Sequence, residues 1–344
     1  MIREALSRED VIRVIERKGC GKVPICHYKW WGNGLEEALG QPLRDMAEEY
    51  PDDIHFIWYD APGYEQSWVP GRPEYRFGYK DYSVTESHSI GNTKIMLDTW
   101  DELDAFLAHV PDLEALYFDR ARIQAQSANG RYMMGAFWGL FHDQLWLIRG
   151  MENLMMDYYD NPEGLKTLCR CFLEMYKKMV DYYAEIGCDG IFSSDDLGHQ
   201  SGSMMSPEIF LEIFFPFYRE FCEYVHSKGM HVFLHSCGDN SKLMKFLVEA
   251  GVDVFHPVQA GCMDYDKTAQ EFGNQISFLA GFDVQKLIVN GTPDEVTKGV
   301  KDMLDSFWKP EGGLLAAAGN GIMPGTPLAN ITAAFQAIAE YKRL

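Results

Sequence analysis

The sequence has few basic residues for its size and contains no long apolar run. Its 344 residues include 31 Lys and Arg against 51 Asp and Glu, which gives a formal net charge of -20. An acidic surface of this kind repels nucleic-acid phosphates and anionic membranes. A membrane span needs about 20 consecutive apolar residues, and the apolar runs here are far shorter. We therefore expect neither a nucleic acid nor a membrane as a partner.

Three other features are missing. Residues 1–19 have the pattern of a charged amphipathic helix with Ser7 as a cap, without the apolar segment and cleavage site of an export signal. The eight cysteines lack paired spacings, and two of them flank Arg170 on one predicted helix, so we expect reduced thiols and a cytoplasmic protein. No G-x-G-x-x-G turn follows a predicted strand, which removes the usual phosphate site of a doubly wound sheet.

Short apolar segments alternate with amphipathic helical segments along the chain. The apolar segments predict eight strands, which begin near residues 23, 54, 131, 190, 231, 252, 276 and 313. Nearly all of them are followed by a helical pattern, and this alternation is typical of a (β/α)8 TIM barrel. Because one barrel accommodates this length, we expect a single domain over residues 1–344. A doubly wound open sheet is the alternative.

The segment from Tyr64 to Ile95 interrupts this alternation after the second strand. It is rich in Tyr, Gly, Pro and Arg and lacks helical periodicity, which predicts an inserted hairpin or lid. Aromatic residues are concentrated in this segment and in the loops that follow the first two strands. Core packing explains many of them, but together they predict a broad apolar mouth over a site.

The segment from His231 to Asn240 combines a buried strand with two residues that bind metals. Val232 to Leu234 is a short apolar run, and the strand ends at His235. Cys237 lies two residues further on, so on an extended chain its thiol points the same way as the imidazole, and this pair suits zinc. Gly238 then permits a tight turn. The alternative is that His235 only ends the strand and that Cys237 is a buried small thiol.

Polar side chains follow seven of the eight predicted strands. In a barrel the C-terminal ends of the strands meet on one face, where active sites lie. We assign catalytic roles to Asp195, Asp196 and Tyr28. The candidate substrate contacts are His27, Trp30, Trp31, Asp60, His256, Gln259, Asp283 and Asn320.

Adjacent acids at a strand end point to opposite sides. One of Asp195 and Asp196 can therefore face the barrel axis while the other caps the next turn, and burial beside a metal or a second acid would shift its pKa toward proton transfer. Asp283 and Asn320 have an equally good structural explanation, because Asp and Asn commonly begin helices.

The chain resembles the uroporphyrinogen decarboxylase superfamily, which includes that decarboxylase and the zinc-dependent methyltransferases of corrinoid metabolism. The resemblance covers most of the chain and is strongest from Gly187 onward. It is carried by GCDGIFSSDDLGHQSGSMMSPEIFLEIFFPFYREF, HVFLHSCGD, AGVDVFHPVQ, LAGFDVQ, GTPDEV and AAAGNGIMPGTPLANI. The resemblance implies a (β/α)8 barrel, in agreement with the strand pattern.

In the methyltransferase branch an H-x-C pair supplies two zinc ligands, and His235 and Cys237 match it. The third ligand there is a Cys in a G-C turn after the last strand, where this chain has Asn320 between two glycines. Asn is a poor zinc ligand. The set could be completed by Asp195, Asp196, His256 or a substrate atom, or the metal has been lost.

The decarboxylase branch binds a substrate with eight carboxylates through an R-Q-A-G-R-Y segment. The equivalent loop here is HYKWWGNG, whose only cation is Lys29. An acidic protein with so few cations at the entrance of its barrel would repel a substrate with eight negative charges. We therefore expect a methyltransferase that moves a methyl group between a small substrate and a thiol or a corrinoid carried by a partner protein, with zinc assisting. Uroporphyrinogen decarboxylation and a catalytically silent binding barrel are the alternatives.

Overall fold

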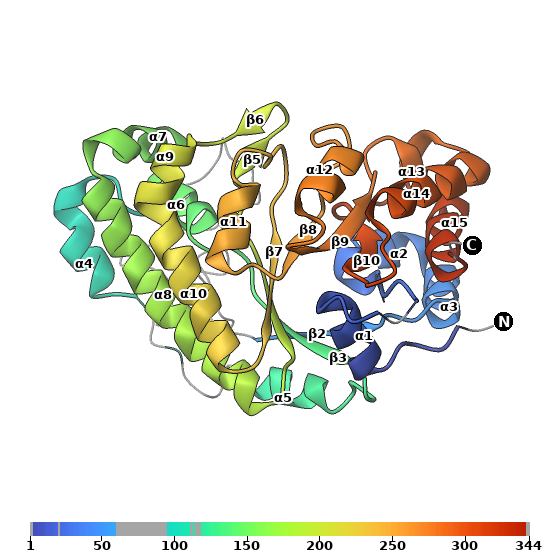
Figure 1. Cartoon of the computed structure of the whole chain (residues 1–344). Coiled ribbons are helices and arrows are strands. Elements are labelled where there is room, and N and C mark those ends of the chain that lie inside the picture. Colours follow the sequence, from blue (N-terminus) through green and yellow to red (C-terminus); the bar gives the residue numbers. More distant parts are fainter. Residues whose placement is uncertain (1–2, 20, 60–94, 111–112, 114–117, 342–344) are drawn as a thin grey trace.

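The computed structural model describes residues 3–341 except residue 20 and the segments 60–94, 111–112 and 114–117. Its main sheet has eight parallel strands in the order β1-β10-β9-β8-β7-β4-β3-β2 (Figure 1). The strands are β1 (Ile25–Cys26), β2 (Ile54–Trp58), β3 (Tyr132–Ala136), β4 (Gly190–Ser194), β7 (His231–His235), β8 (Val254–His256), β9 (Ser277–Phe282) and β10 (Leu314–Ala318). The sheet curls into a nearly closed barrel, which confirms the predicted (β/α)8 class.

The barrel closes between β1 and β2. Asp53 donates its backbone N–H to the carbonyl of Ile25 at 2.9 Å. Its buried carboxylate accepts hydrogen bonds from the N–H groups of Ile25 and Leu6, both at 2.6 Å, and pairs with Arg3. The N-terminal segment is thereby joined to both edge strands.

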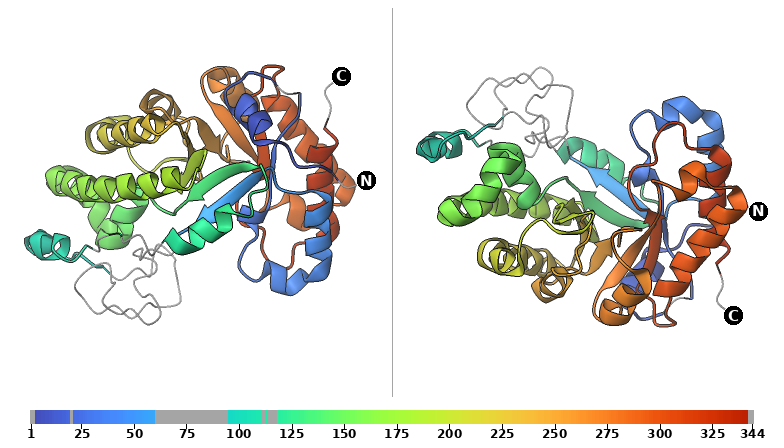
Figure 2. Two further views of the ribbon diagram at one scale, coloured as in Figure 1. Left: turned by 90° about the horizontal axis from the view of Figure 1, so that it is seen from below. Right: turned by 90° about the horizontal axis from the view of Figure 1, so that it is seen from above.

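Helices surround the strands, which occupy the middle of the molecule in both views of Figure 2. They are α1 (Arg8–Ile15), α2 (Leu35–Leu39), α3 (Gln41–Glu49), α4 (Leu103–Leu107), α5 (Asp119–Ala125), α6 (His142–Arg149), α7 (Met151–Asp160), α8 (Pro162–Glu185), α9 (Pro207–Ile209), α10 (Phe215–Ser227), α11 (Met244–Ala250), α12 (Tyr265–Phe272), α13 (Leu287–Asn290), α14 (Pro293–Phe307) and α15 (Leu328–Ala339). Short elements are the 3-10 helices η1 (Tyr28–Trp30) and η2 (Trp100–Glu102), the π-helical turn η4 (Phe210–Phe214) and the hairpin of β5 (Gly198–His199) and β6 (Gly202–Ser203).

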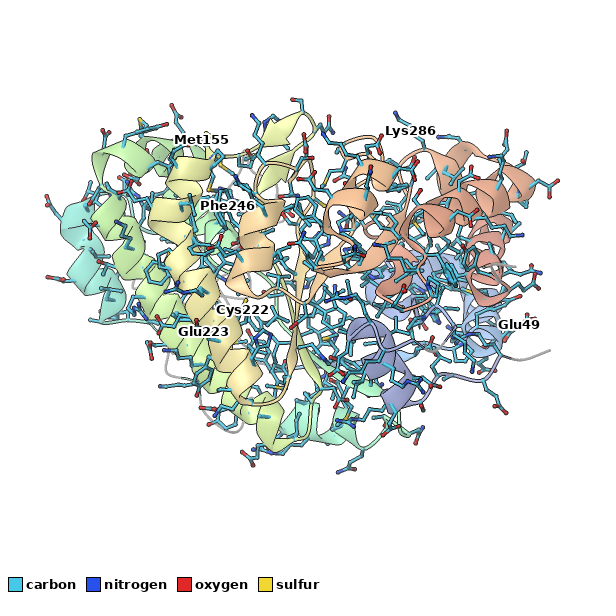
Figure 3. The ribbon with its side chains drawn as sticks, viewed as in Figure 1. Glu49, Met155, Cys222, Glu223, Phe246 and Lys286 are labelled. Carbon is cyan, nitrogen blue, oxygen red and sulfur yellow. The ribbon has the colours of Figure 1, made fainter. Side chains whose placement is uncertain are left out.

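Helices of the outer layer bury one face against the sheet. On α10, Cys222 is buried while its neighbour Glu223 is exposed, and both are labelled in Figure 3. The described cysteines are all free thiols, as expected. Within the described part of the chain, no helix combines the length and the apolar composition that crossing a bilayer requires.

Several helix boundaries differ from the prediction. The predicted cap is confirmed, because Ser7 accepts a hydrogen bond from the N–H of Asp10, but α1 begins only after it. The amphipathic pattern of residues 35–50 predicts one helix, whereas the structure has two, α2 and α3, which are separated at Gly40 with φ of 58°. The predicted lid lies outside the described residues, apart from Ile95, and so does Asp60.

Candidate functional site

A histidine, a cysteine and an aspartate meet where β4 and β7 end. Nε2 of His235 lies 3.4 Å from Sγ of Cys237 and 3.8 Å from Oδ1 of Asp196. One ligand atom from each of the three residues lies within 4.8 Å of the others. The side chain of His235 is buried, whereas that of Asp196 is half exposed. The sequence predicted the His235–Cys237 pair, and the fold adds Asp196 to it.

His256 fixes the tautomer of His235. Nε2 of His256 lies 2.9 Å from the carbonyl oxygen of Ala318, which only accepts hydrogen bonds, so this nitrogen carries the proton. Burial lowers the pKa of His235 to about 4 and that of His256 well below its ordinary value, so both rings are neutral. Nδ1 of His256 therefore accepts from Nδ1 of His235 at 2.7 Å. The lone pair on Nε2 of His235 is left facing Cys237 and Asp196, as a metal ligand requires.

The two adjacent acids have different surroundings. The carboxylate of Asp196 accepts the N–H of Cys237 at 2.9 Å, and its own backbone N–H donates to the carboxylate of Asp143, also at 2.9 Å. Asp143 thereby positions Asp196 against the loop that carries the thiol.

Asp195 is buried and faces the N-terminus of α6 instead. It accepts hydrogen bonds from the backbone N–H groups of Phe141, His142 and Asp143 at 3.1, 3.0 and 2.6 Å. The hydroxyl of Tyr218 donates to it at 2.5 Å. Burial raises the pKa of Asp195 to about 6, although these donors hold the pKa down. Asp195 therefore caps a helix, and the proton-transfer role assigned to it stays a prediction.

Asn320 lies over the thiol of Cys237. Its Nδ2 donates to Sγ at 3.2 Å, and its Oδ1 accepts the N–H of Gly321. Gly319 permits this approach, because a Cβ there would stand 2.9 Å from the carbonyl oxygen of Phe282. Burial raises the pKa of Cys237 well above its ordinary value, with the charge of Asp196 as the next cause. Position 320 thus reaches the sulfur at the place where the resemblance puts a third ligand.

A cavity of about 210 Å³ adjoins this cluster, and Cys237, Gln259, Asp283 and Asn320 are among the residues that line it. Oε1 of Gln259 accepts the N–H of Gly238 at 2.7 Å. Asp283 accepts the N–H groups of the turn that follows β9, which fits the capping interpretation, yet it also lines the cavity. The structure therefore brings Gln259, Asp283 and Asn320 together beside the thiol.

The residues predicted after β1 separate into two groups. Trp30 is buried and stacks on His256, with ring centroids 4.1 Å apart. His27 is buried elsewhere, against Phe335 of α15 and Trp31, so its contacts lie toward the helical layer. Tyr28 lies in η1. The catalytic role assigned to Tyr28 and the substrate-binding roles assigned to His27, Trp30 and Trp31 stay predictions.

Three residues near the cluster were not predicted from the sequence as part of the site. Asp143 comes from the first turn of α6 and had no motif to mark it. Trp138 follows β3, and its ring centroid lies 6.1 Å from that of His235. Lys29 extends over the ring of Trp138. For Lys29, the sequence signal was its position as a single cation between Tyr28 and Trp30 in the loop after the first strand.

The fold and site define a (β/α)8 barrel with a candidate metal cluster at the C-terminal ends of its strands. The family model described as uroporphyrinogen decarboxylase (URO-D) matches residues 122–341, and the chain belongs to this family.

Two methyltransferases resemble this chain, one in sequence and one in structure. A methylated-thiol–coenzyme M methyltransferase of Methanosarcina mazei is 26% identical over 198 residues, which are 56% of this chain and 49% of that protein. The chain thus spans about half the length of this curated relative. The solved structure of a methyltransferase from Methanosarcina mazei matches with a TM-score of 0.69 at 16% identity, over 98% of this chain and 99% of that one. This likeness supports the fold.

Proposed function

We propose that residues 1–344 form one catalytic barrel that moves a methyl group between a small substrate and a thiol or a corrinoid carried by a partner protein, with zinc assisting. The observation that carries this proposal is the cluster of His235, Cys237 and Asp196, in which His256 turns a free imidazole lone pair toward the thiol. The methyltransferase relative supports the same reaction class.

The donor set fits zinc. Imidazole nitrogen, thiolate sulfur and carboxylate oxygen are its usual ligands, and a catalytic site has three protein ligands and an open position. His235, Cys237 and Asp196 would hold the ion, and the cavity beside Cys237 leaves the fourth position to a substrate. Bound there, zinc would act as a Lewis acid on a thiol, ether or amine of the substrate.

The protein's own side chains supply the remaining chemistry. Asp196 is half exposed and has two carboxylate oxygens, so the oxygen that does not bind the ion can take a proton from the substrate or return one. Gln259 and Asn320 offer polar contacts inside the cavity, next to Cys237. Trp30 covers His235 and His256 from the barrel interior and keeps water away from both imidazoles.

The decarboxylase alternative receives no support from the mouth of the barrel. The ammonium of Lys29, the only cation of the first strand-end loop, lies over aromatic rings. A substrate with eight carboxylates would meet a carboxylate at Asp196 and a net charge of -20. We therefore rank methyl transfer first.

The test combines metal analysis with chelation. Purified protein should contain about one zinc ion per chain, and His235→Ala and Cys237→Ala should each lose most of it while keeping the circular dichroism of a folded barrel. His226→Ala and Cys262→Ala are the matched controls, since both residues lie outside the cluster. Chelated protein should lose methyl transfer from methylcobalamin to a thiol. Full zinc content in both cluster variants, or uroporphyrinogen turnover without metal, would overturn the proposal.

A further inference from the structure

The ammonium of Lys29 lies inside a set of four aromatic rings. Its Nζ is 3.6 Å from the ring centroid of Trp138, 4.6 Å from that of Trp30, 5.0 Å from that of Phe192 and 5.1 Å from that of Trp58. All four distances are within the range of cation–π attraction. We call these four rings the aromatic box.

The charge of Lys29 in this box depends on its surroundings. In the part of the chain that the structure describes, no carboxylate forms an ion pair with Lys29. Burial lowers the pKa of Lys29 to about 7, so near neutral pH a large fraction of the side chain is an uncharged amine. An uncharged amine loses the cation–π attraction to the rings. Lys29 is therefore a weakly held occupant on a flexible stem.

The aromatic box adjoins the candidate metal cluster. The ring centroids of Trp30 and Trp138 lie 5.4 and 6.1 Å from that of His235. Trp30 also stacks on His256. Two walls of the box are thus in contact with the imidazoles that would hold and orient the metal, so a ligand in the box lies beside the reacting centre.

We propose that the aromatic box is a binding site for a methylated onium cation, a quaternary ammonium or a sulfonium, which enters as Lys29 leaves. The inference rests on the proposed methyl transfer and names the substrate class for it. An onium carries its methyl groups on a positively charged atom, so an acceptor thiolate can attack one methyl carbon. This attack forms an S–CH3 bond, breaks the bond from that carbon to the onium atom and releases a neutral tertiary amine or thioether.

Ring chemistry favours an onium over an anion. Aromatic faces carry the negative part of the ring quadrupole, so they attract cations. A primary ammonium is compact and strongly hydrated, whereas a methylated onium presents methyl groups to the rings and loses less hydration on entry. Three of the four centroids stand 4.6–5.1 Å from Nζ, which leaves room for methyl groups around a central atom. The net charge of -20 also draws cations.

The test measures binding on metal-depleted protein, so that its outcome is independent of zinc and of turnover. Tetramethylammonium and trimethylsulfonium are titrated calorimetrically, beside neutral 2,2-dimethylpropan-1-ol and anionic methanesulfonate. Lys29→Ala empties the box, so both onium ions should bind at least about ten-fold more tightly than to the wild type. The neutral alcohol should bind Lys29→Ala more weakly than the onium ions do.

Variants of Trp138, the most exposed ring of the aromatic box, complete the test. In the Lys29→Ala background, Trp138→Leu should weaken onium binding by about ten-fold, and Trp138→Phe, which retains a ring, should preserve it. Trp138 is 41% exposed, so both changes leave the core intact. Trp308→Leu, beyond α14, is the control. Equal affinity of Lys29→Ala for the onium ions and the neutral alcohol overturns the proposal. So does methanesulfonate binding that Lys29→Ala abolishes, because Lys29 would then be an anion anchor.

Discussion

At the scale of single residues, the chemistry of His235 depends on the residue behind it. A buried imidazole without a defined partner can place its proton on either nitrogen. Here the carbonyl of Ala318 fixes the proton of His256, and His256 in turn fixes that of His235. The sequence marked His256 as a substrate contact because it ends a strand. Its position behind a ligand depends on the pairing of β7 with β8, where His235 and His256 stand side by side.

Replacing His256 with Phe tests this dependence. Phe preserves the stack on Trp30 but removes the acceptor for the Nδ1 proton of His235, so zinc affinity should fall by about 10–100-fold. Affinity is measured by competition with a zinc chelator. His27→Phe is the matched control, because His27 is also buried but lies outside the cluster. Unchanged affinity in His256→Phe would show that the tautomer needs no second histidine.

Replacing Asn320 with Cys tests the ligand set. Nδ2 of Asn320 already lies 3.2 Å from Sγ of Cys237, so a thiolate at position 320 would join His235 and Cys237 around one ion. Zinc affinity should rise by about ten-fold or more, since an added thiolate strengthens a zinc site. The same chelator competition measures it, with Asn320→Ser and an Asn320→Cys/His235→Ala double variant as controls. No gain over Asn320→Ser would mean that the loop cannot turn the thiolate toward His235.

At the scale of elements, neighbouring residues of one strand end serve different partners. The N-cap residue of α6, Phe141, provides no side-chain cap, and Asp195 at the end of β4, the strand next to β3, takes that role. The sequence predicted that one of the two acids would cap a turn and the other face the axis. It could not say which, because the choice depends on where α6 begins relative to β4.

Exchanging each acid for its amide separates the two roles. Asp195→Asn puts an NH2 group among the N–H donors of α6, so the free energy of unfolding should fall by about 2 kcal/mol or more. Asp196→Asn retains an oxygen for the N–H of Cys237 and is half exposed, so its stability should change by less than about 0.5 kcal/mol. Zinc content should fall only in Asp196→Asn. Urea unfolding and metal analysis of both variants decide the matter, and equal destabilisation would refute the division of roles.

The strands were predictable where the helix boundaries were not. Strands buried on both faces are short apolar runs bounded by turn residues, and this pattern predicted the β4 and β7 segments directly. The helical pattern of apolar residues, in contrast, continues past the residues at which one helix ends and the next begins. The pattern over residues 142–186 predicts helices but not where each one ends. The structure has three there, which are separated at Gly150 with φ of 76° and at Asn161, whose side chain caps α8. Pro207 and the apolar pattern up to Lys228 predict one long helix. The π-helical turn η4 interrupts it and leaves no mark on the apolar pattern.

At the scale of the whole molecule, the site depends on barrel closure. Lys29 and Trp30 follow β1, whereas the other three rings of the box follow or belong to β2, β3 and β4. The aromatic box therefore spans the seam between β1 and β2. No local pattern could predict this box, because its members come together only when the first and second strands meet. The H-x-C pair was predictable for the opposite reason, since its two residues share one strand end.

The seam itself provides the last prediction. The buried carboxylate of Asp53 accepts hydrogen bonds from the N–H groups of Leu6 and Ile25 and pairs with Arg3, so it joins three segments at one point. Asp53→Ala leaves these donors and the guanidinium without their acceptor in the interior, and the free energy of unfolding should fall by about 3–5 kcal/mol. Asp101→Ala, at an exposed acid, should change it by less than about 0.5 kcal/mol.

Urea unfolding gives the size of the effect, and amide hydrogen exchange gives its location. Exchange in Asp53→Ala should accelerate most at Ile25 and along β2, and least along β7 and β8 on the far side of the sheet. Onium binding in the Asp53→Ala/Lys29→Ala protein should weaken with it, because the box spans the same seam. A loss below about 1 kcal/mol with uniform exchange would mean that helix packing, and not Asp53, closes the barrel.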